Sequence, residues 1–290
     1  MRLPRLLTSL AFLITPAYAL TAQIRASEPA SVSQTVDGTT LTIEYSRPRA
    51  RGRDSLFGGI IPWGEVWTPG ANAATTFEVS RDITLDGHPV PKGKYSVWMD
   101  VEPGDWTLVL DPRTNLFHTQ HPTERDDQIR FTLERETRPP IEVLTWWFPA
   151  VGSTGGTLAM QWGNTYVPLQ FEVPPSHDPT LAAELAPRYV GSWEMTDAGP
   201  AGRTSSYEVY YQDGRLQARL RPAPFPEMEN QLLIRIKDDW FIMGLLQNGE
   251  IFDVMDDVLI EFSGDRDGKA AALEVRGEDD QVWARGRRKS

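Results

Sequence analysis

Residues 158–173 of the chain read LAMQWGNTYVPLQFEV, and two stretches of this segment place an apolar side chain at every second position. Those positions are Leu158, Met160 and Trp162, followed by Val167, Leu169, Phe171 and Val173. Successive side chains of a β-strand point to opposite faces of the sheet. The period of two therefore predicts two half-buried strands, each with one face toward a core.

The same alternation recurs through the N-terminal part of the chain. Apolar residues alternate with polar ones at Leu41, Ile43 and Tyr45, at Trp106, Leu108 and Leu110, and at Ile129, Phe131 and Leu133. Turn-forming dipeptides lie between these stretches, at Asp37-Gly38, Asp86-Gly87, Pro103-Gly104 and Gly155-Gly156. Many short antiparallel strands with such turns predict a jelly-roll-like β-sandwich over residues 29–173.

Pro174 and Pro175 interrupt the pattern, because proline cannot donate a hydrogen bond to a sheet. We therefore expect a linker at residues 174–187, with one short helix at Thr180–Pro187. Alternation then resumes at residues 207–211, 216–220, 232–236, 258–262, 273–275 and 282–284. About eight short strands within residues 188–288 predict a small antiparallel β-barrel or an open β-cup. The predicted fold class is all-β, with two domains.

The N-terminus has the three parts of a signal peptide. Arg2 and Arg5 supply positive charge, residues 6–14 are apolar, and Ala17-Tyr18-Ala19 fits the small-x-small rule for cleavage after Ala19. Residues 1–19 are therefore predicted to direct export to the periplasm or the medium of a bacterium. An uncleaved anchor, a buried N-terminal strand and a cut after Ala22 are the alternatives. No apolar run reaches the length of about 18 residues that a bilayer-spanning helix needs, so no membrane span is expected.

Composition narrows the classes of partner. The chain has no Cys, which rules out disulfides, a lipoprotein anchor and thiolate metal sites. Its formal net charge of -11 disfavours nucleic acid and anionic lipid as partners. No cofactor is predicted.

Several catalytic motifs are missing. The chain lacks Gly-x-Ser-x-Gly, Ser-x-x-Lys and His-Glu-x-x-His. Residues 87–94, GHPVPKGK, resemble a phosphate-binding loop, but five residues separate the glycines and Tyr95 follows the lysine. These absences lower the expectation of an enzyme, and no catalytic residue is assigned.

Four arginines alternate along one loop in this acidic chain. Arg47, Arg49, Arg51 and Arg53 lie in the segment SRPRARGRDS. The guanidinium group can bind carboxylate or phosphate through two hydrogen bonds, so this loop could hold an anion. The alternative is a solvated loop whose arginines pair with nearby carboxylates.

A second candidate segment follows Trp67. Gly70 could permit a close backbone approach, Asn72 can both donate and accept, and Trp67 could stack on a ring. The alternative is a capped turn in which Asn72 satisfies backbone groups and Trp67 lies in the core. Ring stacking is also open to one of Trp146 and Trp147, since consecutive residues of a strand face opposite ways. Packing in the core or between the domains is the better interpretation for this pair.

Metal binding is the weaker interpretation of the loop that carries His118 and His121. Acidic residues follow at Glu124, Asp126 and Asp127, but the spacing is loose and metal sites need three or four converging ligands. A solvated loop is the better interpretation. Asp265-x-Asp267-Gly268 is likewise expected to be a hairpin turn, so no metal site is predicted.

An ordered series of motifs runs through the N-terminal domain. It comprises Tyr45-Ser46-Arg47-Pro48, Gly52-Arg53, Phe57-Gly58-Gly59, Pro62-x-Gly64, Trp67, Gly70-Ala71-Asn72, Thr75, Gly87 and Pro91-x-Gly93-x-Tyr95-Ser96. With the strand at Trp106, the series closely resembles the bacterial family called domain of unknown function 2911 over residues 29–173. The resemblance implies export but supplies no activity. It includes Arg47 and Arg53 but neither Arg49 nor Arg51, and Thr68 replaces an arginine that the family usually has.

The second domain is more loosely similar to domain of unknown function 3471, a β domain appended to some serine hydrolases related to beta-lactamases. The similarity rests on Tyr189-Val190-Gly191-Ser192-Trp193, Asp213-Gly214-Arg215-Leu216, and Phe262 leading to Asp265-x-Asp267-Gly268-Lys269. A lipocalin-like cup is the neighbouring possibility. The resemblance implies an accessory role and no hydrolase activity.

Three functional hypotheses follow. The leading one is a non-catalytic binding or envelope-associated module that holds a polar or anionic ligand on the loops between Tyr45 and Thr75. Its ligand-binding residues would be Tyr45, Arg47, Arg53, Trp67, Asn72 and Thr75. The second is a hydrolase acting on an extracytoplasmic glycan or ester, with Glu44, Asp54 or Glu65 as acid or base. The third is a structural role, with Arg47 and Arg53 clamping loop carbonyls and buried acids.

Overall fold

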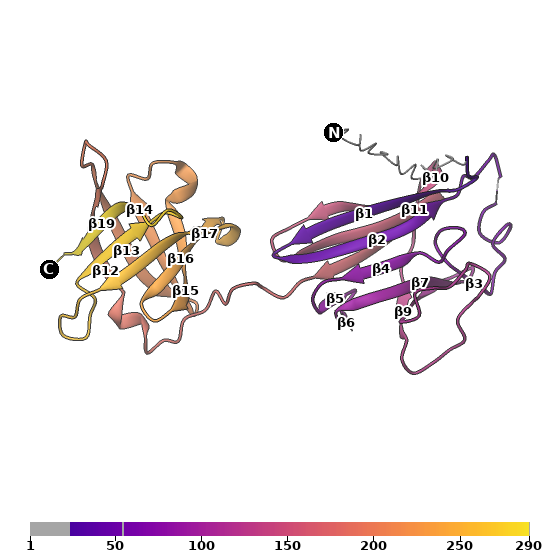
Figure 1. The fold of residues 1–290 in the computed structure, drawn as a ribbon, viewed down its shortest axis with the longest axis horizontal. Coiled ribbons are helices and arrows are strands. Elements are labelled where there is room, and N and C mark those ends of the chain that lie inside the picture. The colour runs from indigo at the N-terminus through magenta and orange to yellow at the C-terminus, as the bar shows by residue number, and fades with distance from the viewer. Residues whose placement is uncertain (1–23, 54, 290) are drawn as a thin grey trace, which may run out of the picture.

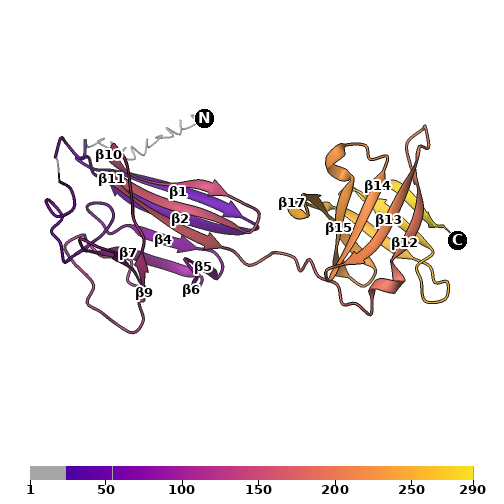
Figure 2. The same cartoon turned by 180° about the vertical axis from the view of Figure 1, so that it is seen from behind.

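The computed structural model describes residues 24–53 and 55–289, and its strands fall into two bodies joined by one extended segment, as Figure 1 and Figure 2 show. The strands of the first body are β1 (Glu28–Val36), β2 (Thr39–Arg47), β3 (Glu65–Trp67), β4 (Thr76–Val79), β5 (Ile83–Leu85), β6 (His88–Val90), β7 (Gly93–Val101), β8 (Trp106–Asp111), β9 (Ile129–Leu133), β10 (Glu136–Val151) and β11 (Gly155–Glu172). The predicted signal peptide at residues 1–19 lies outside the described residues. Within the described residues, no helix combines the length and the apolar composition that crossing a bilayer takes.

Two antiparallel sheets form the first body. The seven-stranded sheet has the order β1-β2-β4-β7-β8-β9, with β3 paired to β7, and the four-stranded sheet has the order β10-β11-β5-β6. One core lies between them, to which both sheets contribute nearly fully buried residues such as Ile43, Phe77, Leu158 and Phe171. The predicted antiparallel β-sandwich is confirmed.

The prediction of two strands at residues 158–162 and 167–173 is wrong in one respect. The two stretches lie in a single strand, β11, of 18 residues. The apolar positions change from even to odd numbers between Trp162 and Val167. Gly163 lies at this change with a φ of +56°, and the pairing of β11 with β10 shifts register beside it. A bulge of this kind adds a residue and reverses which side chains face the core.

The helix predicted at Thr180–Pro187 is also wrong. The chain forms turns there and ends in a short 3-10 helix, η1 (Ala186–Arg188). Pro187 has no N–H to donate, so a helix over these eight residues would lose one of its few internal hydrogen bonds. A helix this short is too weak to form without support from packing, and the N–H of Leu181 bonds to the carbonyl of Gly214, 2.8 Å away in the barrel.

The second body is a closed antiparallel barrel of eight strands, as predicted. Its elements are β12 (Gly191–Asp197), β13 (Thr204–Gln212), β14 (Arg215–Arg221), η2 (Pro226–Met228), β15 (Asn230–Lys237), β16 (Trp240–Gln247), β17 (Glu250–Ser263), β18 (Ala272–Arg276) and β19 (Val282–Arg288). Large side chains fill its interior, among them Trp193, Phe241 and Phe262. Arg288 lies over the Trp193 ring, 4.4 Å from its centroid, and donates to the carbonyls of Arg188, Val190 and Ala270. These contacts join the last strand to the start of the barrel.

Candidate functional site

Tyr45 and Arg47 lie at the end of β2, where the seven-stranded sheet meets the edge strand β10. The Tyr45 hydroxyl accepts the backbone N–H of Trp146 at 3.1 Å. Arg47 donates from Nε to the Leu144 carbonyl at 3.3 Å and from Nη2 to Thr145 Oγ1 at 2.9 Å. These bonds satisfy the polar groups of β10 and connect the two sheets.

Trp67 and Thr75 are buried beneath the same loops. The Trp67 ring packs against Phe57, Trp106 and Trp162, with centroid separations of 5.2, 6.4 and 6.0 Å. Thr75 Oγ1 donates to the Pro69 carbonyl at 3.0 Å, and its backbone N–H donates to Thr68 Oγ1 at 2.9 Å. The turn from Trp67 to Thr75 is therefore held by its own polar groups.

Asn72 and Arg53 are exposed on the loop surface. Asn72 has a φ of +62°, and it donates from Nδ2 to the Ser27 carbonyl at 3.3 Å. Arg53 donates from Nε to the Ala50 carbonyl at 2.6 Å and from Nη2 to the Arg49 carbonyl. The structure thus divides the six candidate residues: Tyr45, Trp67 and Thr75 are buried and support the loops from below, Arg47 is half-buried against β10, and Arg53 and Asn72 are exposed.

The Arg49–Arg53 loop carries three exposed guanidinium groups. Within the described part of the chain, no carboxylate lies within ion-pair distance of Arg49, Arg51 or Arg53; Asp54 lies outside it. Arg51 donates from Nη2 to the Ala26 carbonyl at 3.4 Å, which holds the charge at the surface without neutralising it. One carboxylate lies against the loop, since Glu142 Oε1 accepts the backbone N–H of Arg51 at 2.8 Å. With three arginines against this one acid among the described residues, the loop is locally positive on an acidic protein.

The two described carboxylates of the hydrolase hypothesis, Glu44 and Glu65, contact different partners. Glu44 accepts from Lys94 and from Thr76 Oγ1, and the bond from Lys94 lowers the pKa of Glu44. Glu65 pairs with His121, whose Nδ1 is 3.2 Å from Glu65 Oε1. Asp54 lies outside the described residues. Glu44 and Glu65 therefore do not form an acid–base pair.

The sequence did not single out Asp111, a fully buried residue at the end of β8. Its carboxylate accepts hydrogen bonds from Arg113 Nε at 2.8 Å and from Gln128 Nε2 at 2.6 Å. Arg113 and Gln128 bound the long loop that contains His118 and His121, so Asp111 fixes both ends of that loop. Asp111 lies on the phase opposite to Trp106, Leu108 and Leu110, so the alternation gave no signal of its burial. Among the described residues, no group of three His, Asp or Glu side chains could hold a metal ion.

Residues 27–171 match the model of a family described as a protein of unknown function, DUF2911. The chain belongs to this family. The matched DUF2911 region is the two-sheet body, and no family model matches the barrel. No curated protein and no solved structure matches the chain.

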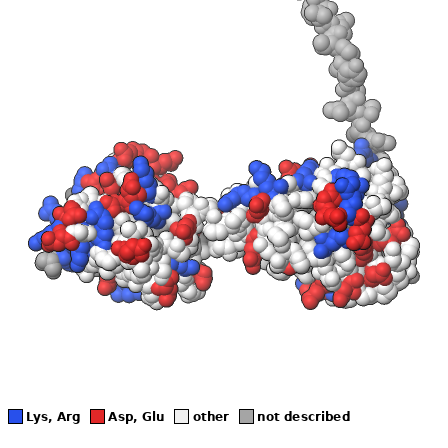
Figure 3. Space-filling view, turned by 90° about the horizontal axis from the view of Figure 1, so that it is seen from below, with Lys and Arg blue, Asp and Glu red and all other residues white. Residues whose placement is uncertain are grey.

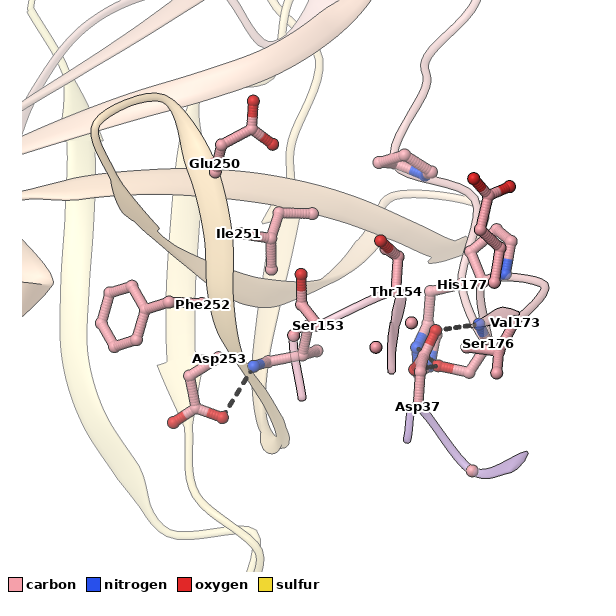
Figure 4. Close-up of a pocket in the computed structure, with 18 of the residues that line it drawn as sticks. Asp37, Ser153, Thr154, Val173, Ser176, His177, Glu250, Ile251, Phe252 and Asp253 are labelled. Carbon is pink, nitrogen blue, oxygen red and sulfur yellow. Dashed lines mark hydrogen bonds between the residues drawn. The ribbon is translucent and has the colours of Figure 1, made fainter. Parts of the chain in front are cut away.

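A cleft of about 1190 Å³ lies between the DUF2911 domain and the barrel. Figure 4 shows residues of the β16–β17 hairpin on one side, Asp37, Ser176 and His177 on the other, and Ser153 and Thr154 between them. Its lining comes from turns and hairpins far apart in the sequence, which is why no motif pointed to it. Clefts between domains are common places for ligands.

Proposed function

We propose that this DUF2911 protein is an exported, non-catalytic binding module that takes a polar or anionic ligand on the loops between Tyr45 and Thr75. The observation that carries the proposal is the exposed Arg49–Arg53 loop, where three guanidinium groups have no carboxylate partner among the described residues. Guanidinium groups that have no carboxylate partner favour carboxylate or phosphate groups, and Arg51 and Arg53 keep donors beyond those that bond the Ala26, Ala50 and Arg49 carbonyls. Asn72 adds an amide on the neighbouring turn.

The buried and half-buried members of the motif have a supporting role in this proposal. Arg47 and Tyr45 fix the base of the arginine loop to β10, and Trp67 and Thr75 fix the turn that presents Asn72. This arrangement joins the binding and structural hypotheses, since a rigid base keeps loop residues in position. The separate pairing of Glu44 and Glu65 gives the hydrolase hypothesis less support.

Export is the second part of the proposal. Arg2 and Arg5, the apolar residues 6–14 and Ala17-x-Ala19 support a periplasmic or secreted location. Mass spectrometry of the protein from its host would give a mature N-terminus at Leu20; a chain retaining Met1 would contradict it.

The barrel is proposed to be an accessory, lipocalin-like module. The closed barrel of eight antiparallel strands supports that comparison. Because Trp193, Phe241 and Phe262 fill the interior, the accessory role is assigned to the outer surface and not to a ligand in the lumen.

The ligand-binding part is tested by titrating residues 20–290 with pyrophosphate and with citrate in a calorimeter at low salt. The double variant Arg51→Ala/Arg53→Ala should bind about 10-fold more weakly or worse, because two charge-assisted contacts are lost. The control Lys237→Ala/Lys269→Ala removes the same charge from the barrel and should bind like the unchanged chain. Equal affinity in both double variants, or no binding of either anion, overturns the proposal.

A further inference from the structure

Trp146 and Trp147 follow one another on β10 and face opposite sides of the four-stranded sheet. Trp146 is 2% exposed and lies in the core between the two sheets. Trp147 therefore lies on the outer face, where it is half-buried. Its ring contacts that of Tyr166 on β11, with the centroids 5.6 Å apart, and the guanidinium of Arg138 lies over the Tyr166 ring, 3.2 Å from its centroid. These contacts hold an aromatic side chain in place on the outside of the sheet.

The arginine loop reaches this outer face because it pairs with β10. Arg49 forms an antiparallel bridge with Val143. The N–H of the next residue, Leu144, donates to the Pro48 carbonyl at 2.9 Å. Since Leu144 lies in the core, Val143 faces outward, as Trp147 does. Side chains directly opposite each other in an antiparallel pair share a face. The exposed guanidinium of Arg49 is therefore on the same face of the sheet as Trp147.

Arg47 brings a second guanidinium group to this face. Its Nη2 donates to Thr145 Oγ1 at 2.9 Å. Thr145 precedes Trp147 by two residues, which is about 7 Å along a strand. Guanidinium groups and an aromatic ring therefore lie along one short stretch of β10, from Val143 to Trp147.

The charge around this stretch is mixed. On the face of the molecule seen in Figure 3, Lys and Arg atoms lie in patches among Asp and Glu atoms. Glu142 accepts the backbone N–H of Arg51, and Glu136 pairs with Arg138. Neighbouring acids reduce the attraction that an arginine patch exerts on an anion. A ligand that also packs on Trp147 gains affinity that does not depend on charge.

We infer that this face binds an acidic polysaccharide, with its carboxylates on the arginine loop and a sugar ring on Trp147. The inference rests on the proposed function and names the class of ligand for the anion site. A uronic acid unit carries a carboxylate that suits a guanidinium fork, and one side of its ring presents C–H groups that pack on an indole. Consecutive units of such a chain occupy the arginine loop and Trp147 together. A small anion such as citrate reaches the arginine loop alone.

Tetragalacturonate is the probe, and maltotetraose is the neutral comparison, because it is a tetrasaccharide with the same kind of linkage but no carboxylates. Residues 20–290 should bind tetragalacturonate at least about 10-fold more tightly than maltotetraose in calorimetry at low salt. Trp147→Leu should weaken tetragalacturonate binding about 10-fold or more, since leucine fills the site without an aromatic face. Trp147→Phe keeps a ring and should weaken binding by a smaller factor.

The control is Trp283→Leu, which removes a Trp that is 43% exposed on the barrel and should bind tetragalacturonate like the unchanged chain. Circular dichroism checks the fold of each variant. Equal affinities of Trp147→Leu and Trp147→Phe overturn the inference, as does an equal loss in Trp283→Leu or an equal affinity of the unchanged chain for the two tetrasaccharides. If the unchanged chain binds citrate but not tetragalacturonate, the inference fails and the proposed function stands. If it binds neither tetragalacturonate nor the small anions, both fail.

Discussion

At the scale of single residues, Arg47 shows how a motif arginine can act within the fold. Its guanidinium bonds Leu144 and Thr145 on the facing sheet, at the edge of β10. Arg49, two residues later, is exposed, and its side chain makes no hydrogen bond within the described part of the chain. Two arginines of one alternating series therefore have different roles.

Replacing Arg47 with alanine should lower the free energy of unfolding by roughly 1–3 kcal/mol, because the Leu144 carbonyl and the Thr145 hydroxyl lose a charged donor. Arg49→Ala should change it by less than about 0.5 kcal/mol, as usual for an exposed side chain. Urea unfolding followed by tryptophan fluorescence measures both. Equal losses in the two variants would argue against the sheet-bridging role of Arg47.

Asp111 makes the stability of the fold depend on pH, with lower stability in acid. Burial raises its pKa, but hydrogen bonds from Arg113 and Gln128 outweigh this effect and hold the pKa at about 2, against 3.8 ordinarily. Since the folded pKa lies below the unfolded one, the carboxylate stabilises the fold above about pH 4. That stabilisation is lost as the pH falls from about 4 toward 2.

The variant Asp111→Asn should therefore be less stable than the unchanged chain at pH 6, and the difference should shrink as the pH approaches 2. Chemical unfolding at pH 6, 4 and 2.5 tests this expectation. A stability difference that stays constant over the whole range would contradict the ionised state of Asp111 in the fold.

At the scale of elements, Gly163 decides how β11 is built. A residue with a side chain would be strained at its φ of +56°, and a Cβ there would lie 2.7 Å from Leu56 Cδ1. The bulge lets one strand place Leu158 and Met160 before it, and Val167 and Leu169 after it, in the same core.

Gly163→Ala should destabilise the DUF2911 domain by roughly 1–3 kcal/mol, from backbone strain and the close contact with Leu56. Gly104→Ala is the control, because a Cβ at Gly104 meets nothing within 4 Å and its φ is not in the left-handed region. Thermal unfolding followed by circular dichroism compares them. If Gly104→Ala loses as much stability as Gly163→Ala, the destabilisation does not come from the strained bulge at Gly163.

At the scale of the whole molecule, the two bodies have separate cores. The main core of the DUF2911 domain and that of the barrel share no residue. The attachments of the linker at Ser176 and Leu181 are local hydrogen bonds. Each body therefore contains what it needs to fold alone.

Fragments 20–176 and 177–290 should each unfold cooperatively, and the full chain should show two calorimetric transitions near those of the fragments. Differential scanning calorimetry of all three proteins tests the division. Failure of both fragments to fold, with one transition in the full chain, would show that the bodies depend on each other.

The sequence alone determined the fold class, the antiparallel strands and the eight-stranded barrel, because side chains that alternate along a strand record which face is buried. It also singled out the segment from Tyr45 to Thr75 as a candidate binding site, since Gly, Asn, Trp and Arg gather there on loops, where binding residues are often placed; that assignment stays a prediction. Local pattern could not show that Arg47 bonds to β10, almost a hundred residues later in the chain. The burial of Asp111 and the cleft between the domains were decided by tertiary structure alone, because both depend on which distant segments the packing of sheets and domains brings together.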